Sequence, residues 1–276
     1  MLNDVFQNLD PIIVSIGPFV LRWYGLAYAL GFLCFALVAY RLAKRWKIGF
    51  DFDALLVVFI CVIAGVIIGA RAGFILFYGA GYYFEHPEAI LAFWEGGMSF
   101  HGGLAGALAG GLVAAKLTGI PYLTLADLGV IGAPLGLLFG RVANFINGEL
   151  WGAPTEASWG VVFGGLAGAV PRHPTQLYEA LLEGIVLFTV LLLLSRKAPP
   201  RPRGTFIGVF LVLYGAFRFI IEFVREPDLQ LGYLAGTWFT MGQLLSVPMM
   251  VAGALVLIYA VRKKLPQQGL PDTPTG

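Results

Sequence analysis

Seven long apolar stretches constrain the fold of this 276-residue chain more than any other feature. A helix needs about 20 apolar residues to cross the hydrocarbon core of a bilayer. We therefore predict an all-α polytopic membrane protein in which one transmembrane domain spans residues 1–276. The predicted spans are residues 19–40, 54–78, 100–117, 124–140, 176–195, 205–224 and 240–261.

The composition excludes several classes of protein. Hydrophobic residues make up 58% of the chain and charged residues 12%, and the mean hydropathy is +0.81. Disorder requires low hydrophobicity and nucleic-acid binding requires a basic surface, so neither is compatible with these values. The cysteines, Cys34 and Cys61, fall in the middle of predicted spans, where we expect small buried apolar residues. No metal-ligand spacing or phosphate-binding glycine loop is present, so we expect no metal and no cofactor.

The distribution of Lys and Arg predicts the orientation. Cytoplasmic loops of membrane proteins are enriched in these residues, and 12 of the 18 in this chain fall on one predicted side. The N-terminus is then outside and the C-terminus cytoplasmic, with a small irregular extracytoplasmic head segment at residues 142–175 and a disordered tail at residues 265–276. The 12 are Arg41, Lys44, Arg45, Lys47, Lys116, Arg196, Lys197, Arg201, Arg203, Arg262, Lys263 and Lys264.

Glycine recurs at every fourth position in three predicted spans. This spacing places small residues on one helix face, where a second backbone can approach closely. It predicts tight helix packing and carries no chemistry of its own. The three sets are Gly65, Gly69 and Gly73; Gly102, Gly106 and Gly110; and Gly132, Gly136 and Gly140.

Six arginines lie on the outer side or in the outer half of a span, where positive charge is disfavoured. An arginine inside the bilayer costs roughly 2.5 to 3.5 kcal/mol on insertion scales and normally faces the bundle interior or a cavity. Their number suggests an anionic ligand on that side. They are Arg22, Arg71, Arg141, Arg172, Arg218 and Arg225.

Two polar stripes follow helical spacing. The first contains Tyr214, Arg218, Glu222 and Arg225, and the second contains Gln176, Glu179 and Glu183. Two interpretations remain open, namely an ion-pair network that joins these two spans and a ligand site. Arg225 is the stronger ligand candidate, because it has no obvious partner of its own apart from Glu222 and Glu226.

Two further segments gather polar residues at the outer ends of spans. The sequence EGGMSFHGG places His101 next to Gly102 and Gly103, which would let a substrate approach, although a lone histidine is commonly a hydrogen-bonded structural residue. The sequence GRVANFINGELWG brings four polar side chains within nine residues and includes an Asn-Gly turn signal. These four are Arg141, Asn144, Asn147 and Glu149.

The segment GRVANFINGELWG resembles the signature of the prolipoprotein diacylglyceryl transferase family. Four other segments resemble the same family in the same order, so the resemblance covers nearly the whole chain. They are IGPFVLRWYGLAYALGF, WEGGMSFHGG, RHPTQLYEALLEG and YGAFRFIIEFVREPD. The stretch between the signature and RHPTQ is shorter than in some members.

The resemblance implies an enzyme of the bacterial cytoplasmic (inner) membrane. Its reaction transfers the diacylglyceryl group of phosphatidylglycerol to the thiol of the lipobox cysteine in a preprolipoprotein signal peptide, with release of glycerol 1-phosphate. The active site is expected to face the outer leaflet. We expect a monomer and no nucleic-acid partner.

Residue by residue, the family pattern assigns its essential histidine to His101, its helix-1 tyrosine to Tyr24 and its helix-6 arginine to Arg225. Its signature residues fall on Arg141, Asn144 and Glu149. We add Asn147, Gly102 and Gly103 as substrate contacts, and Arg218, Glu222, Glu179 and His173 as supporting residues. His101 is either the base that accepts the thiol proton or a ligand of the lipid head group. Tyr24 also fits an interfacial aromatic belt.

Three alternatives compete with this prediction. An anion transporter would need positive residues that continue into the cytoplasmic half, and the chain lacks them. A lipid-binding protein would bind phosphatidylglycerol without turning it over. An intramembrane serine protease rests only on Ser99 near His101, and two residues at this spacing point to different helix faces.

Overall fold

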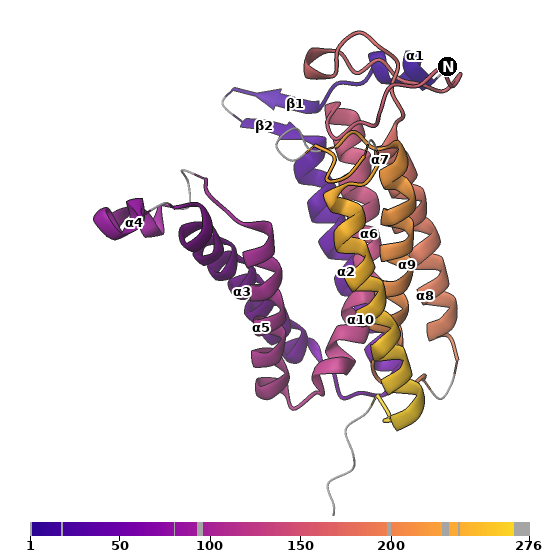
Figure 1. The fold of residues 1–276 in the computed structure, drawn as a ribbon. Helices are drawn as coiled ribbons and strands as arrows, with labels where there is room; N and C mark the ends of the chain where they lie inside the picture. Colours follow the sequence, from indigo (N-terminus) through magenta and orange to yellow (C-terminus); the bar gives the residue numbers. More distant parts are fainter. Residues whose placement is uncertain are drawn as a thin grey trace, which may run out of the picture. The chain divides into compact units, whose positions relative to one another are not determined.

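The fold is known from a computed structural model that describes residues 2–17, 19–79, 81–92, 96–197, 200–227, 232–236 and 238–267 (Figure 1). The chain forms two compact units, which are described separately. The first unit comprises Met1–Leu42 and Asp127–Pro266, and the second comprises Ala43–Ala126 and Gln267–Gly276. Two of the boundaries between the units fall inside helices α2 and α6, and the third follows Pro266.

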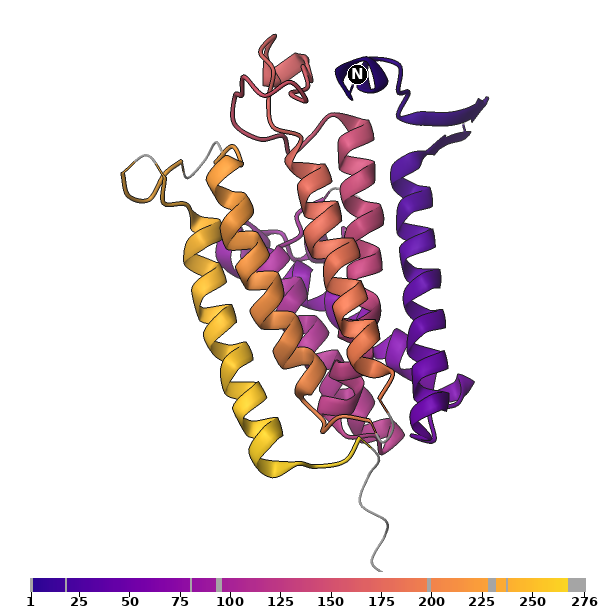
Figure 2. The same ribbon diagram turned by 90° about the vertical axis from the view of Figure 1, so that its right-hand side faces the viewer.

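Seven helices in the described part of the chain are long and apolar enough to cross a bilayer, which confirms the predicted number. They are α2 (Trp23–Trp46), α3 (Phe52–Tyr78), α5 (Phe100–Thr118), α6 (Tyr122–Asn147), the composite helix Thr175–Ser195, Thr205–Val224 and α10 (Met241–Lys263). In the first unit, the composite helix, α9 (Thr205–Ile221) and α10 lie side by side (Figure 2). Helices α2 and α6 of this unit also pack against each other, since a Cβ on Gly31 would lie 3.1 Å from the Gly136 Cα.

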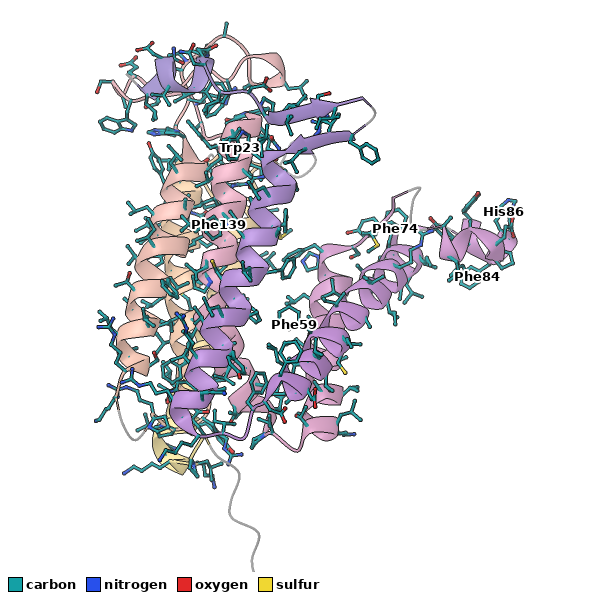
Figure 3. The ribbon with its side chains drawn as sticks, turned by 180° about the vertical axis from the view of Figure 1, so that it is seen from behind. Trp23, Phe59, Phe74, Phe84, His86 and Phe139 are labelled. Atoms are coloured by element: carbon teal, nitrogen blue, oxygen red, sulfur yellow. The ribbon has the colours of Figure 1, made fainter. Side chains whose placement is uncertain are left out.

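The first span begins later than the sequence predicted. Residues Phe19–Arg22 form strand β2, which pairs antiparallel with β1 (Ile12–Ile16), and helix α2 starts only at Trp23 (Figure 3). The hairpin turn starts at Gly17, whose φ of +57° suits a residue without a side chain. Phe19, Val20 and Leu21 are apolar and fit both a strand and a membrane helix, so hydropathy alone could not separate the two.

Helix α6 ends later than predicted, at Asn147, so the irregular head segment starts at residue 148 instead of residue 142. The polar residues of the signature therefore lie on the last turns of a helix. Directly after the helix, Gly148 and Leu150 both adopt positive φ, and these two residues turn the chain away from the helix axis.

The fifth span changes its helical type along its length. It begins as α7 (Thr175–Glu179), continues as the π-helical segment η4 (Ala180–Val186) and ends as α8 (Leu187–Ser195). π-helical turns are rare in proteins, and those that occur are often found at functional sites. A Cβ on Gly184, within this segment, would lie 2.8 Å from the Leu138 Cβ of α6, so the two helices approach closely here.

The head segment packs against the N-terminal helix α1 (Leu2–Gln7). Gln7 Nε2 donates to the Val162 carbonyl at 2.8 Å, and the Phe6 ring lies 4.9 Å from the Phe163 ring. The head is also attached to the helix bundle at Gly152, where a Cβ would lie 2.6 Å from the Val224 carbonyl and 2.7 Å from the His173 carbonyl. Only glycine fits between these two backbones.

The second unit is built on the pair α3 and α5. The predicted glycine faces meet here, because the backbone of Gly65 and Gly69 contacts the backbone of Gly102 and Gly106 so closely that neither helix has room for a Cβ. This confirms the packing prediction for two of the three glycine sets. The Ser99 side chain caps α5 by accepting a hydrogen bond from the Gly102 N–H at 3.3 Å.

A short helical segment, α4 (Tyr82–Glu85) and η1 (Pro87–Leu91), follows α3 in this unit. It carries Phe84 and His86, and the His86 Nδ1 lies 3.3 Å from Glu88 Oε1 (Figure 3). Arg71 on α3 holds η1 and the chain that follows it by donating to the carbonyls of Ala89, Ile90, Gly96 and Gly97.

The predicted disordered tail lies mostly outside the described residues. Of its first residues, Leu265 and Pro266 accept hydrogen bonds from Arg203, at 3.0 Å from its backbone N–H and 2.9 Å from its Nε. These contacts tie the end of α10 to the start of α9.

Candidate active site

One buried carboxylate, that of Glu179, organises the charged residues of the first unit. Three arginines from different segments contact it: the distances are 2.8 Å from Arg141 Nε to Oε2, 2.6 Å from Arg218 Nη1 to Oε1, and 2.6 Å from Arg225 Nη1 to Oε1. The Glu179 side chain has no exposed surface. We call these four residues, with Glu222 and Glu183, the arginine cluster.

Glu222 adds a second carboxylate at the edge of the cluster. Its Oε2 lies 2.9 Å from Arg218 Nη2, so this guanidinium joins two carboxylates. Arg218 on α9 therefore links the fifth and sixth spans, as one of the two sequence interpretations predicted. Because two carboxylates hold the Arg218 guanidinium, the direction in which its plane points is fixed.

Glu183 differs from the other carboxylates of the cluster. It is fully buried, and neither of its oxygens has a hydrogen bond or an ion pair among the described residues. The charges of Glu179, Arg141, Arg218 and Arg225 all act on it, so it lies close to the ion pairs without joining them.

Arg225 follows the end of α9 and its segment η5 (Glu222–Val224), and it is 8% exposed. From the sequence we expected no partner for Arg225 beyond its neighbours in the chain, and this was wrong, because Arg225 pairs with Glu179 from the fifth span. Burial lowers the pKa of Arg225 below its ordinary value, an effect that Glu179 opposes and Arg218 reinforces. A guanidinium keeps its charge at neutral pH even so.

The signature residues form a second polar group beside the arginine cluster. Glu149 Oε1 accepts hydrogen bonds from Asn144 Nδ2 at 2.8 Å and from Asn147 Nδ2 at 3.4 Å. The Glu149 carbonyl accepts another from Gln176 Nε2 at 2.6 Å. The positive φ of Leu150 turns the chain so that Glu149 folds back over the end of α6. Asn144, Asn147 and Glu149 are thus brought together as the sequence predicted.

Two predicted residues flank this group. Tyr24 lies on the first turn of α2, where its hydroxyl is 3.1 Å from that of Tyr28 and where the charges of Glu149 and Arg141 act on it. His173 lies in the head, with its Nδ1 3.1 Å from the Tyr178 hydroxyl, which also accepts from Trp159. Burial lowers the pKa of His173 below its ordinary value of 6.5. His173 thus supports the head and the start of α7.

His101, Gly102 and Gly103 belong to the second unit, at the N-terminal end of α5. The His101 side chain is exposed within this unit, and its ring lies 5.7 Å from that of Phe100. Gly102 faces α3, where a Cβ would collide with the backbone of Gly69 and lie 3.0 Å from the Gly73 Cα. Close helix packing therefore already accounts for glycine at position 102.

The other three outer arginines, Arg172, Arg71 and Arg22, do not belong to the arginine cluster. Arg172 Nη1 forms an ion pair with Glu226 at 2.8 Å, and its Nε donates to the Ala167 carbonyl at 2.8 Å, so it fastens the head to the end of the sixth span. Arg71 holds carbonyls of its own unit. Arg22 lies exposed on β2. Of the six arginines, three converge on one carboxylate.

Sequence reasoning missed two features of this site. It placed Arg141 in the signature without linking it to Glu179, because helical periodicity shows which residues share a face but not which helices become neighbours. It also assigned no role to Gly152, because the backbones of Val224 and His173 that crowd it are distant in the sequence.

The fold and this site together define a class. The chain is a multi-pass membrane protein with a buried, polar, arginine-rich centre at one end of a helix bundle. Ionisable residues are rare within a bilayer, and those that occur face the bundle interior and usually have a function. A buried group of arginines suits an anionic ligand. The class therefore consists of membrane enzymes and transporters that act on anionic substrates.

Comparison with known proteins narrows the class. Residues 11–259 match the family model described as prolipoprotein diacylglyceryl transferase. A protein of Geobacter sulfurreducens is 47% identical over 260 residues, covering 94% of this chain and 98% of its own length. A protein of Oleidesulfovibrio alaskensis is 48% identical over 262 residues, covering 94% and 96%. Both relatives are named phosphatidylglycerol–prolipoprotein diacylglyceryl transferase. This chain belongs to the prolipoprotein diacylglyceryl transferase family.

Proposed function

We propose that this protein transfers the diacylglyceryl group of phosphatidylglycerol to the thiol of the lipobox cysteine in preprolipoproteins and releases glycerol 1-phosphate. This transfer is the first step of bacterial lipoprotein maturation. Family membership and the names of the relatives support the reaction. The convergence of three arginines on the buried Glu179 is the structural observation that carries the proposal.

The reaction breaks a carbon–oxygen bond of a phosphodiester, so the charge on the phosphate grows from one negative towards two as glycerol phosphate leaves. Cations directed at these oxygens stabilise the transition state more than the ground state, and only such a difference accelerates the chemical step. Arg141 and Arg225 are the phosphate ligands in this proposal, because a guanidinium can hold two oxygens of one phosphate at once.

Glu179, Arg218 and Glu222 support these two arginines. Arg141 and Arg225 share Glu179 as their common anchor, and Arg218 connects Glu179 to Glu222. A donor that is already oriented before the substrate arrives costs no reorganisation during the reaction. The network therefore serves to hold the guanidinium groups in place.

The attacking group is the thiolate of the substrate cysteine. A free cysteine has a pKa of about 8.5 and is mostly protonated at neutral pH. His101 either accepts this proton or orients the lipid head group while the arginines favour the thiolate. After attack, sulfur is bonded to the glycerol carbon, and the oxygen of the broken bond leaves with the phosphate.

The remaining residues act on substrate position. Asn144, Asn147 and Glu149 provide donors and acceptors for the hydroxyl groups of the head-group glycerol. Tyr24, Gly102 and Gly103 complete the substrate contacts, and His173 supports the site from the head.

The proposed location is the bacterial cytoplasmic membrane. The distribution of positive residues supports an N-terminus outside and a C-terminus in the cytoplasm, and in this proposal the active site faces the outer leaflet. In this proposal both substrates reach the active site from within the bilayer. The protein acts as a monomer and needs no cofactor.

The test is mass spectrometry of a lipobox peptide incubated with the purified protein and phosphatidylglycerol. We expect a diacylglyceryl adduct on the peptide cysteine, release of an equal amount of glycerol phosphate and a weaker reaction for His101→Ala. A preparation that binds phosphatidylglycerol but forms no adduct would contradict the proposal and would favour a lipid-binding or transport role.

A further inference from the structure

The first turn of α10 approaches the arginine cluster at Gly242. A Cβ built on Gly242 would lie 2.5 Å from the Glu222 Cδ and 2.6 Å from each of its two oxygens. Real Cβ contacts are never this close, so the Glu222 carboxylate fills the space that a side chain at position 242 would occupy. Only glycine allows the carboxylate to lie against the helix backbone here.

This first turn is held firmly in place. Thr240 caps α10 by accepting a hydrogen bond from the Gln243 N–H at 3.3 Å, and Gln243 Oε1 accepts one from the Thr240 N–H at 3.1 Å. Thr240 and Gln243 are both buried. This reciprocal arrangement satisfies two of the N–H groups at the helix start. The backbone around Gly242 is therefore a fixed surface.

The position also suits a negative charge. Gly242 is the second helical residue of α10, and the N-terminus of a helix carries a partial positive charge that stabilises anions. Glu222 thus lies between this helix end and Arg218 Nη2, at 2.9 Å from the latter. Its carboxylate is held from both sides and is 6% exposed.

We infer that Gly242 is a positioning residue for the transfer reaction: by leaving room for the Glu222 carboxylate at the start of α10, it fixes Arg218 and, through the shared Glu179 carboxylate, the direction of Arg141 and Arg225. This inference rests on the proposed function. It assigns a role to the seventh span, whose own sequence contributes no charged residue to the arginine cluster.

The test is a double-mutant comparison at positions 242 and 222. In Gly242→Ala the new methyl group pushes the carboxylate away from Arg218, and we expect kcat/KM for the lipobox peptide to fall by about tenfold or more. Glu222→Asp shortens the acid by one methylene group, which weakens the contact with Arg218 in the otherwise unchanged protein. In the double variant the shorter acid leaves room for the methyl group, and we expect roughly fivefold recovery over Gly242→Ala alone, as for coupled neighbouring residues.

Gly253→Ala is the matched control, because it crowds the same pair of helices away from the site. A Cβ there would lie 2.8 Å from the Leu211 Cβ and 2.9 Å from the Gly208 carbonyl on α9. Thermal unfolding measures the packing damage in both glycine variants. We expect Glu222→Asp to give no recovery in the Gly253→Ala background.

The outcomes separate this inference from the proposed function. Wild-type protein that forms no adduct would contradict the proposed function itself. Wild-type transfer together with normal activity of Gly242→Ala would overturn the inference alone. The inference would also be overturned if Glu222→Asp restored activity equally in the Gly242→Ala and Gly253→Ala backgrounds or in neither, since Gly242 would then serve only general packing.

Discussion

At the scale of single residues, Glu179 and Glu183 offer a direct comparison. They lie four positions apart on one helix and are both fully buried, yet Glu179 binds three arginines and Glu183 has no partner among the described residues. Removing one member of a buried ion pair leaves an uncompensated charge and commonly costs 3–5 kcal/mol, of the order of the whole stability margin of a domain. Burial alone therefore does not tell which of the two carboxylates holds the site together.

We predict that Glu179→Gln severely lowers both thermal stability and transfer activity, because three guanidinium groups lose their common anion. Glu183→Gln has the same shape change and the same depth of burial, but we expect it to be far less destabilising. Unfolding in detergent and the adduct assay measure the two effects. Equal losses in the two variants would show that the ion pairs to Glu179 contribute nothing specific.

His173 gives a pH-dependent prediction. Burial lowers its pKa below the ordinary value of 6.5, so the unfolded chain takes up this proton more readily than the folded protein. Stability therefore declines as the pH falls through about 6.5 towards the lowered pKa. We expect His173→Gln to reduce this decline when melting temperatures are compared from pH 7.5 to pH 5.5. Identical pH dependence in the two proteins would contradict the assignment.

The sequence predicted most members of the arginine cluster but not their pairing. Helical spacing placed Arg218, Glu222 and Arg225 on one stripe, and Glu179 on another, because that information is local. The contact between Arg141 and Glu179 depends on which helices become neighbours, and the pairing of Arg225 with Glu179 depends on how the chain turns after α9. Neither is encoded in the periodicity of one helix.

At the scale of elements, glycine determines how closely helices approach. The four-residue spacing correctly predicted that α3 and α5 pack through Gly65, Gly69, Gly102 and Gly106. The glycines of α6 are not equivalent: a Cβ on Gly132 would lie 2.9 Å from the Phe35 ring of α2, whereas a Cβ on Gly136 or Gly140 would meet nothing within 4 Å. The spacing predicts a helix face that lacks large side chains, but it does not predict which of its glycines a neighbouring helix will contact.

We therefore predict unequal effects for two alanine substitutions. Gly69→Ala forces α3 and α5 apart, since its methyl group would lie 2.8 Å from the Gly106 Cα. Overpacking of this kind commonly costs about 1–3 kcal/mol. Gly136→Ala adds a methyl group to open space and improves helix propensity, so we expect unchanged or slightly higher stability. Equal destabilisation of the two variants, measured as melting temperature in one detergent, would contradict the packing of α3 on α5.

The ends of elements were the least predictable part of the fold. The strand β2 at Phe19–Arg22 and the extension of α6 to Asn147 both lie where apolar and polar segments meet. At such junctions hydropathy does not show where a helix or strand ends, whereas the hydrogen bonds do. For α6 they join Asn144 and Glu149, a pair that only the three-dimensional turn at Leu150 creates.

At the scale of the whole molecule, the charge distribution predicts the orientation. Cys34 and Cys61 are both free, so a variant with alanine at both positions provides a thiol-free background. We expect this variant to keep its transfer activity, because the attacking thiol belongs to the substrate. Loss of activity in a folded protein would instead point to a covalent intermediate on the enzyme.

In that background, Ser158→Cys in the head and Lys197→Cys after α8 test the orientation, since both positions are exposed. A membrane-impermeant thiol reagent added to intact spheroplasts should label position 158 and leave position 197 unlabelled until the membrane is opened. The reverse pattern would invert the proposed topology and place the arginine cluster near the cytoplasmic leaflet.

The central claim is that arginines gathered around Glu179 carry the diacylglyceryl transfer. The most direct test measures, side by side, the rate at which wild-type protein, Arg141→Ala and Arg225→Ala form the diacylglyceryl adduct on a lipobox peptide, with membrane insertion and folding checked for each. We predict rapid adduct formation by the wild type and losses of at least about a hundredfold in both variants, the scale seen when an oriented charge-stabilising donor is removed. Near-normal rates in either folded variant would contradict the phosphate role assigned to that arginine.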